Sequence, residues 1–188
     1  MPMLRVRTVF TGITGSPWVN TLNFGGPAQT GNQTDADAAV AATGVFWSAV
    51  DAHMNTAVQW TTLPDVLFLG DDGIAAAAYA TTPQTGSGGA ADSILPLTSQ
   101  ALVRTLTSVF IGGRQIRGRI FVPGLTEAAN LTGQLVAGVQ SAIATAAQTL
   151  NSVATPPLAV WSKANGTVTP VSAVSVWSQF AVLRSRRD

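Results

Sequence analysis

The chain has 188 residues, no cysteine and a formal net charge of +1. The length favours one domain with a sizeable core, and the missing cysteine excludes disulfides and thiolate metal sites. Asp, Glu, Lys and Arg make up 10% of the residues, against about 25% in an average soluble domain. A polar but uncharged exterior suits burial against other copies of the chain, although a codon bias toward Ala, Gly, Thr and Val produces the same composition.

The first half of the chain predicts a hairpin, a helix and further strands. Leu4–Thr11 and Trp18–Phe24 flank the turn sequence GITGSP and read as two antiparallel strands. Thr34 is the expected N-cap of a helix that runs to about Ala57, with Asp35 in the first turn, where the helix dipole favours carboxylates. Shorter apolar runs then predict strands over 58–63 and 65–70. Residues 74–82 read as strand or helix, with the two threonines and Pro83 favouring a strand, and a mobile Gly/Ser-rich loop is expected over 84–92.

The second half predicts the same order of elements. Ala101–Val109 and Gln115–Val122 form an expected hairpin, Thr126 caps an expected long helix, and extended segments follow over 157–163 and 167–177. We therefore expect a single domain, 1–188, that contains two pseudo-repeats, 4–82 and 101–178. The fold class is α+β, with an antiparallel sheet and two main helices. It is not a plain jelly roll, whose helices are short.

The second expected helix carries no Lys, Arg, Asp or Glu between Glu127 and Val153. A solvated helix usually gains stability and solubility from charge pairs spaced four residues apart. One side of this helix is apolar, and the other side carries amides and hydroxyls. We expect another subunit to cover the polar side, with a solvated uncharged face as the alternative. The expected interface residues are Gln134, Gln140, Ser141, Thr145 and Gln148.

Basic side chains are gathered in two places. Four arginines lie within the sixteen positions from Arg104 to Arg119, and three more lie near the C-terminus. Strand alternation places Arg117 and Arg119 on one face, about 7 Å apart. Arginine binds phosphate or carboxylate bidentately, so the partner is nucleic acid or a neighbouring copy, and a solvated face is the third alternative. The expected nucleic-acid-binding or anion-binding residues are Arg114, Arg117, Arg119, Arg184, Arg186 and Arg187.

Residues able to perform catalysis are scarce. The only histidine, His53, stands within the first expected helix and reads as a packing residue. Asp71 and Asp72 in GDDG favour a tight turn, with a cation site or a hydrolase carboxylate site as the alternative. GSGGAA over 86–91 opens no helix and therefore predicts no dinucleotide site. We expect no catalytic residue, no metal, no cofactor and no membrane partner, since no apolar run is long enough to span a bilayer.

Three segments together resemble short coat or virion proteins of small viruses known from environmental sequencing. They are Gln115–Asn130, Ala159–Val171 and Val176–Asp188, with the uncharged helix between the first two. The resemblance implies a virion structural protein that assembles from many copies of itself around a viral nucleic acid. Many such proteins carry a long basic N-terminal arm, whereas only Arg5 and Arg7 stand near the start here. The alternatives are an accessory binding module that recognises a protein or glycan surface, and a hydrolase.

Overall fold

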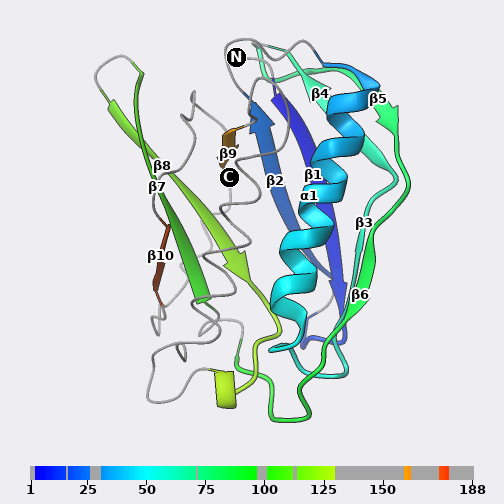
Figure 1. The fold of residues 1–188 in the computed structure, drawn as a ribbon, viewed down its shortest axis with the longest axis vertical. Helices are drawn as coiled ribbons and strands as arrows, with labels where there is room; N and C mark the ends of the chain where they lie inside the picture. The colour runs from blue at the N-terminus through cyan, green and yellow to red at the C-terminus, as the bar shows by residue number, and fades with distance from the viewer. Residues whose placement is uncertain are drawn as a thin grey trace.

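The computed structural model describes residues 3–15, 17–25, 31–70, 72–96, 101–111, 114–129, 159–161 and 174–177, and of residues 101–121, 159–161 and 174–177 it describes the backbone alone. One helix, α1 (Gln33–Asp51), stands among ten strands in this part of the chain (Figure 1). The strands are β1 (Met3–Thr11), β2 (Trp18–Gly25), β3 (Gln59–Thr62), β4 (Asp65–Leu69), β5 (Ala75–Ala80), β6 (Thr85–Ser87), β7 (Ala101–Ile111), β8 (Arg114–Val122), β9 (Ala159–Trp161) and β10 (Val174–Trp177).

The strands form two antiparallel sheets. The larger sheet has seven strands in the order β5-β4-β1-β2-β9, and β3 lies between β1 and β6. Since β4 and β3 pair with successive parts of β1, β3–β4 and β5–β6 each act as one long bent strand. The smaller sheet has the order β10-β7-β8, and Figure 1 shows it beside β9 and β2, on the far side of the larger sheet from β5.

The core lies between α1 and one face of the larger sheet. Alternate residues of β1, among them Thr8 and Phe10, are buried on this face. Trp47 of α1 is fully buried between Phe10 and Phe46, with ring centroids 4.7 and 4.8 Å away and edge-to-face geometry. Its indole Nε1–H donates a 3.1 Å hydrogen bond to Oγ1 of Thr8. The aromatic cluster therefore fixes how α1 sits on β1.

The ends of α1 differ from the sequence-based expectation. Asn32, not Thr34, is the N-cap, because its side chain accepts the N–H of Asp35 at 2.8 Å and donates to the Asp35 carboxylate at 3.0 Å. This reciprocal pair satisfies a free helix N–H that Thr34, already inside the helix, does not reach. The helix ends at Asp51 and not near Ala57, since Met54 instead forms a bridge with Leu125.

The expectation of a mobile loop over 84–92 is wrong. Thr85–Ser87 form β6, and the N–H of Gly88 donates to the carbonyl of Val58 at 2.8 Å. A Cβ on Gly86 would lie 2.6 Å from the ring of Trp60, so the glycine serves close packing and not flexibility. Local composition cannot distinguish these two uses of glycine.

The two predicted hairpins are confirmed as β1–β2 and β7–β8, and the antiparallel sheet is confirmed. The second helix falls outside the described residues beyond Ala129. At its expected start, Thr126 forms a bridge with Ile94, and the N–H of Ala128 donates to the Asp92 carboxylate at 2.6 Å. Asp92 therefore satisfies a backbone N–H close to the position where Thr126 was expected to act as an N-cap.

Replacing Trp47 by Phe should lower the free energy of unfolding by about 1–3 kcal/mol, because it opens a cavity and leaves the Thr8 hydroxyl without its donor. Urea denaturation followed by circular dichroism measures the loss. Trp18→Phe is the matched control, since the buried indole Nε1 of Trp18 has no hydrogen-bond partner among the described residues, and its loss should be smaller. Equal losses for the two variants would show that the Trp47–Thr8 bond contributes nothing.

Candidate functional site

The β7–β8 hairpin holds four arginine positions, and its register brings two of them together. Ile111 pairs with Arg114 at the tip, and regular pairing from there would place Arg104 opposite Phe121. An irregularity of two residues in β7, between Thr105 and Val109, shifts the register. As a result Arg104 lies directly opposite Arg119.

These positions define a surface that we call the arginine face. Directly opposed residues of an antiparallel pair share a face, as do residues two apart on one strand, so Arg104, Arg117 and Arg119 belong together. Ser175 of β10 pairs with Arg104 and joins the same face. Arg114 falls on the reverse face, so it separates from the group in which the sequence placed it.

Arg104 is absent from the sequence-based list of expected binding residues, although the register places it opposite Arg119. Its distance of fifteen positions from Arg119 gives no local signal, and only the irregularity in β7 sets the two side by side. Like charges directly opposite each other destabilise a strand pair. A bound anion reverses this effect, because guanidinium groups bind phosphate or carboxylate in a bidentate manner. The pairing makes this face a candidate anion-binding site.

The remaining predicted positions lie outside the described residues. They are the C-terminal arginines Arg184, Arg186 and Arg187, and the interface residues Gln134, Gln140, Ser141, Thr145 and Gln148.

Charge is distributed unequally between the two parts of the chain. Residues 1–100 hold two arginines and seven carboxylates, whereas residues 101–188 hold eight cations and two carboxylates. Their formal net charges are therefore −5 and +6. Among the described residues of the first part, the carboxylates of Asp37, Asp65, Asp72 and Asp92 are exposed. The sequence is therefore acidic over the part that forms α1 and most of the larger sheet, and basic over the part that contains β7 and β8.

Asp51, the last residue of α1, is half-buried beside Trp60 of β3. Its carboxylate accepts the indole N–H of Trp60 at 3.2 Å. Burial raises the pKa of Asp51 above its ordinary value, and the hydrogen bond from Trp60 opposes this rise in part.

His53 is also half-buried, and its backbone carbonyl accepts the N–H of Thr126 at 3.2 Å. In the described ranges, no three His, Asp or Glu side chains are grouped to hold a metal ion.

GDDG forms the turn between β4 and β5. The N–H of Gly70 donates to the carbonyl of Ile74 at 2.9 Å, and Gly73 has a positive φ of 77°. The Asp72 carboxylate accepts the N–H of Ile74 at 2.9 Å. Asp72 therefore serves the turn, as its sequence indicated, while Asp71 lies outside the described residues.

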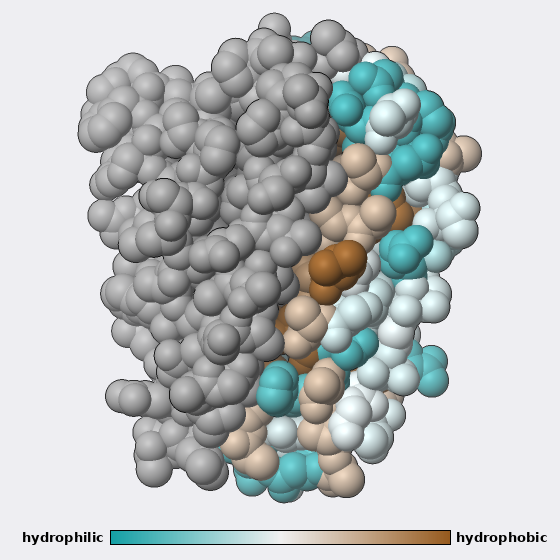
Figure 2. All heavy atoms as spheres, viewed as in Figure 1, coloured by the Kyte–Doolittle hydropathy of each residue, from teal (hydrophilic) through white to brown (hydrophobic). Residues whose placement is uncertain are grey.

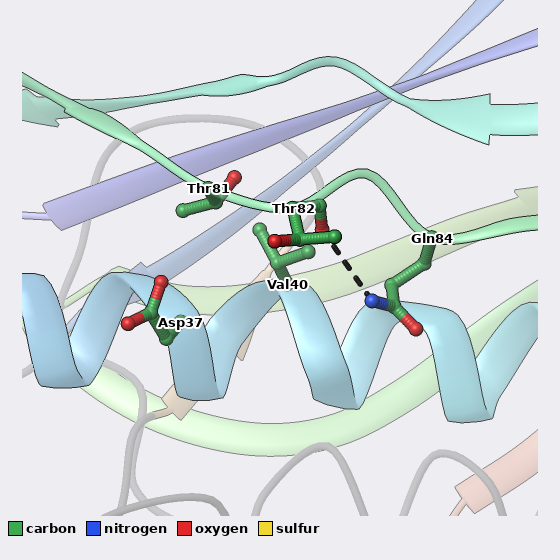
Figure 3. A pocket seen from close by; sticks show the side chains of 5 residues that line it. All are labelled: Asp37, Val40, Thr81, Thr82 and Gln84. Atoms are coloured by element: carbon green, nitrogen blue, oxygen red, sulfur yellow. Dashed lines mark hydrogen bonds between the residues drawn. The ribbon is translucent and has the colours of Figure 1, made fainter.

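A polar cleft of about 230 Å³ lies between α1 and the edge of the larger sheet (Figure 3). Gln84 donates to the carbonyl of Thr82 at 3.4 Å, and Gln33 donates to the Asp37 carboxylate at 2.9 Å. Asp37 is the one ionisable group in the lining, so the cleft lacks the paired groups that acid–base catalysis needs. The lining residues are Asp37, Val40, Thr81, Thr82 and Gln84.

Comparisons of the chain with protein families, with curated proteins and with solved structures find no match. In the described part of the chain, no helix is both long enough and apolar enough to cross a membrane.

Asp51 should make stability depend on pH. The folded state binds its proton more tightly than the unfolded state, so the free energy of unfolding falls as pH rises from below 3.8 through the raised pKa. Asp51→Asn keeps an acceptor for Trp60 and removes the charge, so it should be more stable than the natural chain at pH 7 and have a flatter profile. Urea midpoints between pH 3.5 and 7 test this, with exposed Asp65→Asn as the control. A less stable Asp51→Asn at pH 7 would contradict the prediction.

Proposed function

We propose that this chain is a structural protein of a virion, which assembles from many copies of itself into a coat around a nucleic-acid genome. The observation that carries the proposal is a continuous uncharged exterior made by α1 and the β5–β6 edge. The charge separation and the arginine face support the part that concerns the genome.

The outward side of α1 has the composition of a contact surface. No charged residue stands between Asp37 and Asp51, and Ala41, Val45 and Ser48 are exposed. Val45 has 52% of its surface exposed, and Figure 2 shows a band of apolar residues along this helix. A helix that faces only water gains solubility from charges at such positions. This side of α1 is therefore suited to burial against another copy.

The neutral surface continues from α1 onto the edge of the larger sheet. Residues 73–91, which contain β5 and β6, hold no charged side chain. The helix α1 contacts the segment between β5 and β6, since a Cβ on Gly44 of α1 would lie 2.8 Å from Cγ of Gln84. Exposed sheet edges usually carry charges that prevent association. Here that protection is missing on both the edge and the adjoining helix.

The charge separation suits a shell with two different sides. In such a shell the basic side faces the genome, the acidic side faces away from it, and the neutral surfaces meet between subunits. A few arginine–phosphate contacts are weak in one copy, but they add up when many copies are joined. This arrangement needs no long basic arm.

Self-association tests the proposal. At high micromolar concentration, light scattering should give masses many times the 19.3 kDa of one chain, and electron microscopy should show particles or tubes. Val45→Lys should raise the concentration needed for association about tenfold, because an unpaired ammonium resists desolvation. Thr56→Lys, in an exposed loop, is the matched control and should assemble normally. A stable monomer would refute the coat function and favour the accessory binding module.

The arginine face makes a separate prediction about genome retention. Arg104→Gln, Arg117→Gln and Arg119→Gln should each lower nucleic-acid affinity and reduce the slope of log K against log salt by about 0.7–0.9. Arg114→Gln removes the same charge from the reverse face and should have a smaller effect. Fluorescence anisotropy at several salt concentrations measures both quantities. Equal effects of all four substitutions would show that the face has no special role.

A further inference from the structure

The arginine face carries a second row of positions, beside the arginines. Trp177 of β10, Leu102 of β7 and Phe121 of β8 lie directly opposite one another across the smaller sheet. Each stands two residues from its neighbour in the row of Ser175, Arg104 and Arg119, so both rows share one face. Two aromatic positions therefore adjoin two arginine positions, about 7 Å along the strands.

The reverse face of this sheet differs in composition. Val176, Val103 and Ile120 form its corresponding row. Val122 continues the same side of β8, two positions beyond Ile120, and its side chain is fully buried in the core. The apolar face of the hairpin is therefore the one that leads into the core. The arginine face is the opposite face of the same strands.

We propose that the arginine face binds single-stranded nucleic acid, with phosphates at Arg104, Arg117 and Arg119 and bases stacked at Phe121 and Trp177. Three arginines alone suit any polyanion, so the aromatic positions decide the class of ligand. Bases present their flat faces to aromatic side chains only when they are unpaired, because a duplex hides those faces in its own stack. A sheet face that combines cations with aromatic residues is matched to this chemistry.

The competing occupant of this face is a carboxylate-bearing surface of a neighbouring copy. Carboxylates satisfy the arginines, but they gain nothing from the adjoining aromatic row. The single-stranded ligand uses both rows. The inference rests on the proposed function only because it requires a nucleic-acid genome. It adds that the nucleic acid is single-stranded where it touches the arginine face.

The experiment measures anisotropy of a labelled 20-nucleotide oligothymidine and of a duplex of equal length, with the full chain at several salt concentrations. The single strand should bind at least tenfold more tightly than the duplex. Phe121→Leu and Trp177→Leu should each weaken its binding about 5- to 100-fold and leave the salt slope unchanged. Arg119→Gln should instead lower the slope. The two rows are thereby separated by two different readouts.

Two further variants guard against a folding defect. Phe121→Tyr keeps an aromatic ring and should bind as the natural chain does. Ile120→Leu lies on the reverse face of the same strand and should also leave affinity unchanged. Thermal unfolding of each variant identifies any that is misfolded. If Phe121→Leu folds normally and binds the single strand as tightly as the natural chain, the stacking role is wrong.

The outcomes separate this inference from the proposed function. Equal affinity for duplex and single strand overturns the inference and leaves assembly around a genome standing. Normal assembly without any nucleic-acid binding overturns the inference and assigns the arginines to the neighbouring copy. Tight single-strand binding by a chain that never assembles supports the inference and refutes the coat.

Discussion

The burial of Trp47 against β1 is the contact on which the rest of the arrangement depends. Its ring is enclosed by Phe10 and Phe46, and its N–H is bound by Thr8. A large side chain held in this way fixes the rotation of α1 about its own axis. With Trp47 turned inward, Val45 must lie on the outward side, where it is exposed. The neutral exterior is thus a consequence of how the core is packed.

Among the described strands, pairing joins the acidic and basic parts of the chain at one place, the larger sheet. β9, from the basic part of the chain, pairs with β2 of the larger sheet in the acidic part. This pairing joins the two regions, while the arginine face lies on a separate three-stranded sheet. Among the described residues, Arg104, Arg117 and Arg119 lie on the three-stranded sheet, whereas Asp65 lies on the seven-stranded sheet. Under the proposed coat function, the two kinds of charge act on different partners.

Sequence reasoning was correct where the determining interactions are local, and wrong where distant residues compete. Alternation along β1 and β2 predicts their hairpin, since each strand needs only to bury one face. The end of α1 is different, because Met54 leaves the helix to pair with Leu125, seventy-one positions away. The segment that contains Gly86 reads as a loop until Trp60 is placed against it. Arg104 is absent from the expected binding residues because a shift of two residues in β7 decides which residue it opposes.

The sequence by itself determined the antiparallel hairpins, the first helix, the shortage of charge and the gathering of arginines. Each of these is written in residue types and short spacings, which act within a few positions along the chain. Only the tertiary structure decided which side of α1 is exposed, that the β5–β6 edge adjoins it, and that Arg104 faces Arg119 across β7 and β8. These relations depend on packing and register between segments far apart in sequence. Their physical cause lies in contacts that no short stretch contains.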